Sequence, residues 1–454
     1  MNNRFNKIQL ICIALLFFAI LLQGFTHWIP MKSLGGFTDQ TKLCKLTFQT
    51  YIDGQYQDKL TEYAKEKTGF REFFIRNYNQ VCYSCFRRIN NAHIYEGANN
   101  ELYMKMYLYE RSGRRLREYY PSVEDAKIDA QKNVEATVAF IDTLHQHGKE
   151  FLFVFAPSKT SVYPEWIPKQ WSDSVSSFSL EEYYIQLFKE NNIPHIDFRS
   201  WFQTIKDTVP YPLYTRYATH WSEYILPFVA DSMLRRIDAE TGYKMPSIKW
   251  VDENLTTAYS EQDKELETDL NLMFPMKKPA LPRPIFTLQD TIGKDKPYLF
   301  VIADSYFVQL CLSPFVNAFS DWTYWKYNDI IISPHEEYYW KRVKWLPEAY
   351  DMLKQSDIVL AIFTDAMVYE YMFGFIDTAY EMFEKGGLDE EEKIAADTGE
   401  GCLSVNRDVE GIVPRYARIT VEYQDENGNK QTIRVREDIS VAFQHEIDHL
   451  NGIR

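Results

Sequence analysis

Hydrophobic residues gather in short continuous runs along the middle of the chain. The runs at residues 151–156, 300–303 and 358–363 are rich in aromatic and aliphatic side chains. Apolar runs of this length, without polar alternation, are typical of strands that are buried on both faces of a parallel sheet. We therefore predict a sheet whose strands are enclosed between layers of helices.

Between these runs, apolar residues recur at helical spacing. The clearest predicted helix covers residues 126–147 and ends before Gly148, and a second covers residues 179–191, ahead of a strand at 194–198. A strand, a helix and a strand in this order imply a right-handed crossover between parallel strands, so the pattern predicts a doubly wound α/β fold. We also expect helices at residues 221–238, 345–354 and 369–383, and an insertion or lid at residues 255–290.

A longer apolar run covers residues 8–24 and follows Arg4 and Lys7. Its length suits one membrane-spanning helix, and the bulky residues at its end do not resemble a signal-peptide cleavage site. We predict an uncleaved signal anchor in residues 1–30, which would place the rest of the chain outside the cytoplasm. Residues 31–125 are then expected to form a juxtamembrane helical region.

Composition narrows the function classes. The chain has 454 residues, a formal net charge of −14 and 16% aromatic residues. This length allows two or three domains with a substantial core. The acidic balance argues against nucleic-acid binding, so no nucleic-acid partner is expected.

Cys82 and Cys85 have a spacing found in redox motifs and in half of a zinc site. No second cysteine pair completes a zinc site, and no thioredoxin-like strand precedes the pair. We expect a pair on a helix, reduced or disulfide-linked, without a catalytic role.

The predicted strand at residues 300–303 leads into Ser305, and His220 stands where a loop meets a predicted helix. Both positions suit the carboxyl edge of a parallel sheet. A serine hydroxyl needs a nearby base to become a nucleophile, and an imidazole can serve. We predict that Ser305 and His220 lie within hydrogen-bonding reach.

The segment Ala303-Asp304-Ser305-Tyr306 resembles the Gly-Asp-Ser block of the SGNH hydrolases. The segment Ala218-Thr219-His220-Trp221 resembles the Asp-x-His-Trp block of their membrane-anchored alginate O-acetyltransferase branch. That branch has an Asp where Ala218 stands. Another acid, with Glu223 and Asp304 nearest in sequence, could substitute; otherwise a Ser-His dyad acts slowly, or the site only binds glycan.

This resemblance implies an SGNH-like domain over residues 126–385 that carries or removes acetyl groups on an exported polysaccharide through an acylated Ser305. It implies no cofactor for this part, an acyl-donor membrane protein as partner, and a single-pass inner-membrane protein with its bulk in the periplasm. Residues 157–164 resemble the family's Pro-x-Lys-x-x-x-Tyr-Pro loop, which makes Lys159 and Tyr163 candidate substrate-binding residues. A catalytically inactive glycan-binding module is the alternative.

The composition changes near residue 385, and the end of the chain carries different chemistry. His445 and His449 lie four residues apart on one predicted helical face, with Glu446 between them as a general base. Cys402 is the candidate third metal ligand. Between these motifs, a hairpin is predicted with strands at residues 418–423 and 431–435.

Residues 399–454 resemble the C-terminal part of peptide deformylase, through Glu400-Gly401-Cys402-Leu403-Ser404 and the segment from Gln444 to Gly452. The resemblance implies a divalent iron, zinc or nickel ion and removal of N-formyl groups. The family's first motif, Gly-x-Gly-x-Ala-Ala-x-Gln, does not occur in the chain, so we expect an incomplete and inactive fragment. We predict a composite chain with a junction at residues 386–398, arising from a natural fusion, a misassembled gene or a deliberate chimera.

Overall fold

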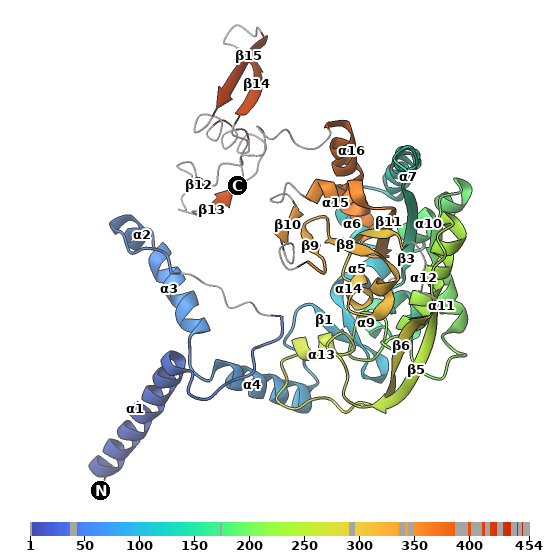
Figure 1. The fold of residues 1–454 in the computed structure, drawn as a ribbon. Helices are drawn as coiled ribbons and strands as arrows, with labels where there is room; N and C mark the ends of the chain where they lie inside the picture. Colours follow the sequence, from blue (N-terminus) through green and yellow to red (C-terminus); the bar gives the residue numbers. More distant parts are fainter. Residues whose placement is uncertain are drawn as a thin grey trace.

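The structure is a computed structural model that describes residues 2–36, 43–172, 175–289, 296–335, 341–343 and 349–385. In the tail it describes residues 398–400, 411–413, 418–424, 430–436, 443 and 447. Figure 1 shows a helix at the N-terminus that projects away from a large α/β body.

The α/β body is built on a seven-stranded sheet with the order β10-β9-β8-β7-β11-β3-β4. Strands β8, β7, β11, β3 and β4 run parallel to one another. At the other side of β8, β9 pairs with β8 and β10 pairs with β9, both in antiparallel fashion. This architecture confirms the predicted doubly wound α/β fold. The strands are β3 (Glu150–Ala156), β4 (His195–Asp197), β7 (Tyr298–Ala303), β8 (Asp321–Lys326), β9 (Ile330–Ile332), β10 (Lys341–Arg342) and β11 (Ile358–Thr364).

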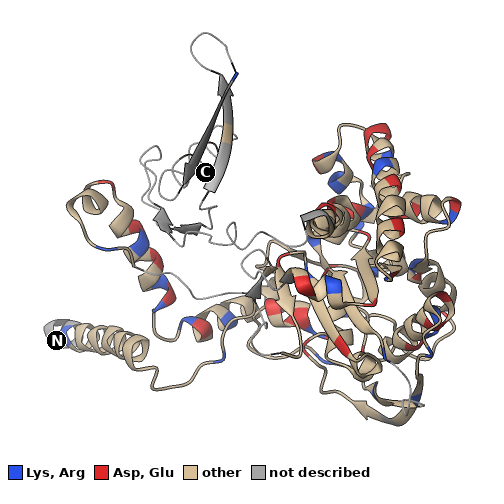
Figure 2. Ribbon diagram, turned by 45° about the horizontal axis from the view of Figure 1, so that its top comes forward, with Lys and Arg blue, Asp and Glu red and all other residues tan. Residues whose placement is uncertain are grey.

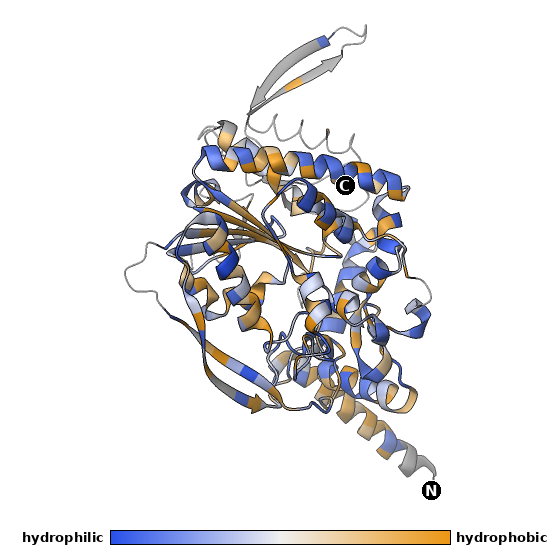
Figure 3. Ribbon diagram, turned by 90° about the vertical axis from the view of Figure 1, so that its right-hand side faces the viewer, coloured by the Kyte–Doolittle hydropathy of each residue, from blue (hydrophilic) through white to orange (hydrophobic). Residues whose placement is uncertain are grey.

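The three central apolar runs form β3, β7 and β11, which are almost entirely buried. Alternate residues point to opposite faces of a strand, so each run contributes to two cores. One core contains helices α11 (Phe198–Ile205), α12 (Leu226–Thr241) and α14 (Phe307–Cys311). The other contains α7 (Val123–Gln146), α10 (Leu180–Glu190), α15 (Ala349–Gln355) and α16 (Phe375–Lys385), and Figure 3 shows the hydrophobic strands between the helices.

Two predicted helices begin later than their sequence pattern indicates. The helix expected from residue 221 starts at Leu226, where Pro227 fits the first turn. The helix expected from residue 369 is preceded by the 3₁₀ segment η6 (Val368–Gly374) and starts at Phe375. Other short helical segments are η1 (Ala98–Asn100), α8 (Lys159–Val162), η2 (Pro164–Trp166), α9 (Lys169–Ser172) and η3 (Pro314–Ala318).

The predicted insertion between α12 and β7 has more regular structure than its sequence indicated. Strands β5 (Ser247–Thr256) and β6 (Leu281–Gln289) form an antiparallel pair, and the short helix α13 (Glu265–Asp269) lies between them in sequence. Pro282 and Pro284 lie within β6, which tolerates them because each strand of a two-stranded sheet has a free edge.

The N-terminal region is helical, as its spacing predicts. Residues Lys7–Thr26 are long and apolar enough to cross a membrane, and beyond Lys7 this part of the helix has no charged residue (Figure 2). Cys82 and Cys85 lie on α4 as free cysteines. The elements are α1 (Asn2–Thr26), α2 (Phe48–Ile52), α3 (Gln55–Glu66), α4 (Arg71–Phe86), β1 (Ile94–Glu96), β2 (Leu102–Met104), α5 (Lys105–Arg111) and α6 (Arg114–Tyr119).

In the tail, β14 (Arg418–Gln424) and β15 (Lys430–Arg436) pair in antiparallel fashion, which confirms the predicted hairpin. Strands β12 (Thr398–Glu400) and β13 (Gly411–Val413) form a second pair. The predicted metal ligands Cys402, His445 and His449, and the predicted base Glu446, lie outside the described residues.

Candidate active site

Ser305 lies just beyond the carboxyl end of β7, a central strand flanked by β8 and β11. The turn that presents it is fixed by Asp304, whose carboxylate accepts hydrogen bonds from the Tyr306 amide (2.9 Å) and from the Thr364 amide and hydroxyl (both 2.8 Å). Burial raises the pKa of Asp304, and these hydrogen bonds oppose that rise. Asp304 therefore ties the nucleophile turn to the end of β11.

His220 approaches Ser305 from the loop before α12. Its Nε2 atom and the Ser305 hydroxyl are hydrogen-bonded at 2.9 Å. This distance confirms the prediction that the two side chains lie within hydrogen-bonding reach. The imidazole also contacts the Tyr306 ring, with 4.9 Å between the centroids.

The acid beside His220 is Glu265, the first residue of α13. Its Oε1 atom lies 2.9 Å from His220 Nδ1 and accepts further hydrogen bonds from the Thr219 amide (2.6 Å) and the His220 amide (3.2 Å). An ionised carboxylate accepts only, so Nδ1 carries the proton and Nε2 is left free to accept from Ser305. The three side chains form one hydrogen-bonded chain.

The predicted substitutes for the missing Asp do not contact His220 through any hydrogen bond in the described structure. Glu223 pairs with Arg283 at 2.9 Å, and Asp304 holds the serine turn. No local sequence signal identifies Glu265, because it lies 45 residues after His220 in the segment predicted to be an insertion or lid. Its one recognisable feature is an acidic residue in the first turn of a helix, which is too common to identify a site.

Backbone contacts hold α13 against the histidine loop. The amides of Leu266 and Glu267, in the first turn of α13, donate to the Tyr217 carbonyl at 3.0 and 3.3 Å. On the other side of the loop, the Tyr306 hydroxyl donates to the Thr219 carbonyl at 2.8 Å. The side-chain amide of Gln309 donates to the Trp221 carbonyl at 3.0 Å. The position of the imidazole is therefore fixed by both the serine turn and the insertion.

Tyr327 follows β8 and borders the nucleophile from the other side. Its amide donates to the Ala303 carbonyl at 2.9 Å, and its backbone has a positive φ of 57°. Burial raises the pKa of the Tyr327 phenol, while hydrogen bonding with the Ser305 hydroxyl and amide opposes that rise. Tyr327 therefore lies beside the serine turn, a position that the sequence did not indicate.

Lys159 does not fit the predicted substrate-binding role. Its ammonium group is buried, pairs with Glu101 at 2.7 Å, and donates to the carbonyls of Thr215 (2.7 Å) and Ala218 (3.5 Å). Burial lowers the pKa of Lys159, and Glu101 acts in the opposite direction. The residue instead stabilises the backbone of the histidine loop.

Tyr163 requires the same correction. Its side chain is buried, its hydroxyl accepts a hydrogen bond from the Leu213 amide at 3.1 Å, and its ring stacks on Trp166 at 4.5 Å between centroids. A side chain engaged in this way supports the loop before His220 and has no free surface for a ligand.

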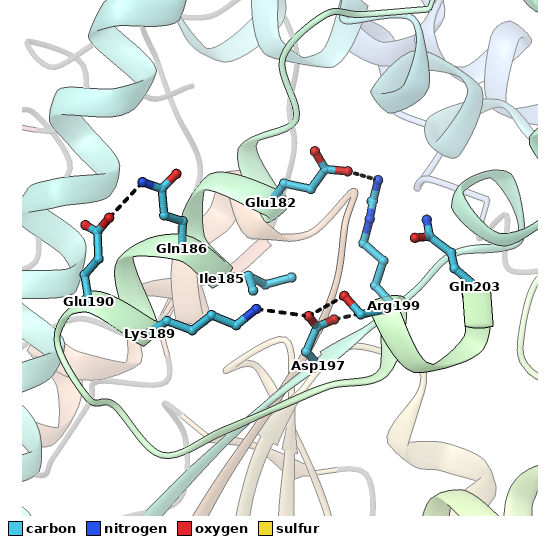
Figure 4. A pocket seen from close by; sticks show the side chains of 9 residues that line it. Glu182, Ile185, Gln186, Lys189, Glu190, Asp197, Arg199 and Gln203 are labelled. Atoms are coloured by element: carbon cyan, nitrogen blue, oxygen red, sulfur yellow. Dashed lines mark hydrogen bonds and ion pairs between the residues drawn. The ribbon is translucent and has the colours of Figure 1, made fainter. Parts of the chain in front are cut away.

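A hollow of about 410 Å³ lies beside α10 and α11, at the opposite edge of the sheet from β10 (Figure 4). Most of its charged groups have partners: Arg199 pairs with Glu182 and with Glu181, which lies outside the lining, at 2.8 Å, and Lys189 pairs with Asp197 at 3.6 Å. Neither Ser305 nor His220 lines it. We therefore place the candidate active site at the carboxyl ends of β7 and β8.

Two family comparisons divide the chain. Residues 116–286 match the family described as "SGNH hydrolase-like domain, acetyltransferase AlgX". Residues 386–454 match the polypeptide deformylase family.

The curated relatives include peptide deformylases, which agree with the family match of the tail. Peptide deformylases from Halalkalibacterium halodurans and Streptococcus gordonii are 58% and 56% identical to it over 55 residues, which is 12% of this chain. The matched residues span 30% and 27% of the lengths of those two relatives. The ligands predicted from the sequence, Cys402, His445 and His449, are one thiolate and two imidazoles, a donor set that suits zinc or iron. Within the described residues, no group of three or more His, Cys, Asp or Glu side chains is arranged to hold a metal ion.

Two solved structures cover most of this chain, at low sequence identity and with low TM-scores. The O-acetyltransferase domain of Pseudomonas putida AlgJ is 14% identical, with a TM-score of 0.40, and covers 63% of this chain and 99% of its own. Pseudomonas aeruginosa AlgX is 12% identical, with a TM-score of 0.41, and covers 78% of this chain and 87% of its own. On the family matches, the chain is a composite of an AlgX-type SGNH hydrolase-like acetyltransferase domain and a C-terminal polypeptide deformylase segment.

Proposed function

We propose that the α/β body is an O-acetyltransferase or acetylesterase in which Ser305 is the nucleophile, His220 the general base and Glu265 the residue that orients the imidazole. The observation that carries this proposal is the continuous hydrogen-bonded chain from Ser305 Oγ through the His220 ring to Glu265, with both links at 2.9 Å. Such a chain activates a serine hydroxyl that is otherwise a weak nucleophile at neutral pH.

In the first step, Ser305 Oγ attacks the acyl carbonyl carbon while its proton moves to His220 Nε2. The tetrahedral intermediate collapses when the imidazolium returns this proton to the leaving oxygen, and Ser305 is left acetylated. In the second step, His220 removes a proton from an acceptor hydroxyl or from water, whose oxygen attacks the acetyl group and releases Ser305. Glu265 stabilises the imidazolium in both steps.

The negative oxygen of each tetrahedral intermediate needs donors that are already in place. We assign this role to the phenol of Tyr327, a residue whose own backbone amide is hydrogen-bonded to the Ala303 carbonyl beside the serine turn. Burial keeps the Tyr327 phenol protonated, because it raises the pKa. A neutral phenol can donate to the oxyanion without losing its own proton.

We propose an exported polysaccharide as the acetyl acceptor and a membrane protein as the acyl donor. The apolar segment Lys7–Thr26 supports a single-pass anchor in the inner membrane, with the catalytic body on the periplasmic side. The AlgX-type match over residues 116–286 supports the polysaccharide.

Trapping of the acyl-enzyme tests the proposal. The full chain is incubated with p-nitrophenyl acetate or a sulfonyl fluoride, and the modified residue is located by peptide mass spectrometry. We expect one adduct on Ser305, lost in His220→Ala, whose side chain can no longer accept the proton. An unmodified Ser305 together with retained affinity for a polysaccharide would instead favour the glycan-binding module.

A further inference from the structure

Helix α4 carries an exposed apolar stripe along one side. Phe74, Tyr78 and Val81 are 50%, 58% and 54% exposed, and they are separated by four and three residues. This spacing places them on one face of the helix. Three large apolar side chains aligned in water are costly, because each leaves its apolar surface hydrated.

The polar side of α4 holds the segment that follows α13. The Asn79 side chain donates to the Leu270 carbonyl at 3.0 Å, and the Phe274 amide donates to the Gln80 side chain at 3.0 Å. Phe274 is itself 66% exposed. The insertion that supplies Glu265 is therefore attached to α4 on the side away from the apolar stripe.

The start of α4 is in close contact with the end of the apolar helix α1. A Cβ atom added at Gly69 would lie 2.0 Å from the Ile20 carbonyl oxygen, and one added at Gly24 would lie 2.3 Å from the Lys67 carbonyl oxygen. Only glycine permits backbones to approach this closely. Figure 1 shows α4 running from this junction across to the catalytic body, while α1 continues away from it.

The charge around α4 differs from that of the whole chain. Residues 70–90 contain four arginines and one glutamate, whereas the chain has a formal net charge of −14. A helix with aromatic residues on one side and a net basic charge is typical of segments that lie in the headgroup region of a bilayer. Anionic lipid headgroups attract such a local excess of positive charge.

We propose that α4 is an interfacial helix, and that the stripe formed by Phe74, Tyr78 and Val81 is buried in the membrane leaflet that α1 enters. The inference rests on the proposed anchoring of the chain through α1. Because Ile20 lies within the apolar span and its carbonyl lies against Gly69, α4 starts at the level of the bilayer surface. The membrane then positions α4, and α4 positions the insertion that carries Glu265.

Lipid photocrosslinking tests this assignment in the full chain. A benzoylphenylalanine residue replaces Tyr78, and the protein is reconstituted into vesicles of phosphatidylethanolamine and phosphatidylglycerol. After irradiation, phospholipid adducts are measured by mass spectrometry. Two matched positions carry the same side chain: Leu16, within the apolar span, and Lys59, on the charged helix α3, where the side chain is 52% exposed.

We expect adducts at position 78 at a yield close to that of position 16 and several-fold above that of position 59. The same replacement at Val81 gives a second measurement if the protein with a changed Tyr78 does not fold. Adducts at position 16 without adducts at 78 and 81 would overturn the interfacial helix and leave the anchor intact. No adduct at any position would overturn the anchor, and this inference with it, but would leave acetylation of Ser305 untouched.

Discussion

The α/β body and the tail of this composite chain each carry a predicted catalytic motif, but the structures around the two motifs differ. The motif residues Ser305 and His220 are joined by a seven-stranded sheet with helices on both faces, and the structure brings them to 2.9 Å. The tail carries Cys402 and the His445-Glu446-x-x-His449 segment, yet its match spans less than a third of the length of the deformylases that resemble it. The α/β body therefore surrounds its motif with a whole fold, which we call its frame, whereas the tail has only a small part of the corresponding fold.

The difference teaches that a motif specifies the reacting atoms, whereas the frame supplies their remaining partners. Around Ser305, the frame contributes Glu265 and Tyr327, neither of which belongs to the serine or histidine motif. In the tail, the first deformylase motif, with its Gln, is missing from the sequence. A metal ligand set without donors for the transition state is expected to give little catalysis.

The largest effect should come from removing the nucleophile. We expect Ser305→Ala to reduce p-nitrophenyl acetate turnover to background, roughly 10⁶-fold where chemistry limits the rate, with little change in thermal stability. The matched variant, Glu446→Ala, should leave this turnover unchanged. Initial rates with the purified full chain check both expectations.

Ser305→Ala and Glu446→Ala also test whether the tail is inactive. We expect no deformylation of a formyl-Met peptide by the full chain with added ferrous, nickel or zinc ion. Robust deformylation that is lost in Glu446→Ala and kept in Ser305→Ala would show that the tail is a working enzyme.

A smaller loss is expected at the acid. Glu265→Gln keeps the shape of the side chain but removes the charge that orients the imidazole, so kcat should fall by about 10² to 10⁴. Ala218→Asp is the control, because the position is fully buried and Glu265 already occupies His220 Nδ1. A gain in turnover from Ala218→Asp, or a wild-type kcat in Glu265→Gln, would show that Glu265 is not the acid that orients His220.

The smallest effect concerns the stability of the α/β body. Burial, with a further contribution from Asp365, raises the pKa of Glu110 to about 8, so the folded body keeps a proton that the unfolded chain releases near its ordinary value of 4.5. Stability should therefore fall as the pH rises from about 5 to 8. Glu110→Gln should flatten this dependence.

Thermal unfolding of wild type and variant at pH 5, 6.5 and 8 checks the slope. An equally steep decline in Glu110→Gln would mean that another group controls it. Glu124→Gln is a suitable control, because Glu124 is an exposed residue of α7.

The α/β class could be predicted from the sequence, because β3, β7 and β11 are buried on both faces and short continuous apolar runs are typical of such strands. It also identified Ser305 and His220, since a strand end and a loop before a helix converge on one sheet edge. The antiparallel strands β9 and β10 escaped prediction because short edge strands lack a distinctive pattern.

The remaining parts of the site depend on contacts between residues distant in sequence. Glu265 reaches His220 only because the first amides of α13 bind the Tyr217 carbonyl. Lys159 was predicted to bind substrate because residues 157–164 resemble the family's Pro-x-Lys-x-x-x-Tyr-Pro loop, but Glu101, 58 positions earlier, pairs with it in the interior. Neither the Glu265–His220 pair nor the Glu101–Lys159 pair has a local sequence pattern, so neither could be predicted from the sequence.

The Lys159–Glu101 pair also limits how this chain can be cut into fragments for expression. A fragment starting near residue 126 would follow the apparent domain boundary, but it would leave the Lys159 ammonium buried without its carboxylate. Removing one partner of a buried ion pair costs about 3 to 5 kcal/mol, a large share of the stability of an ordinary domain. A soluble fragment for crystallography should therefore begin ahead of β2, so that it retains Glu101.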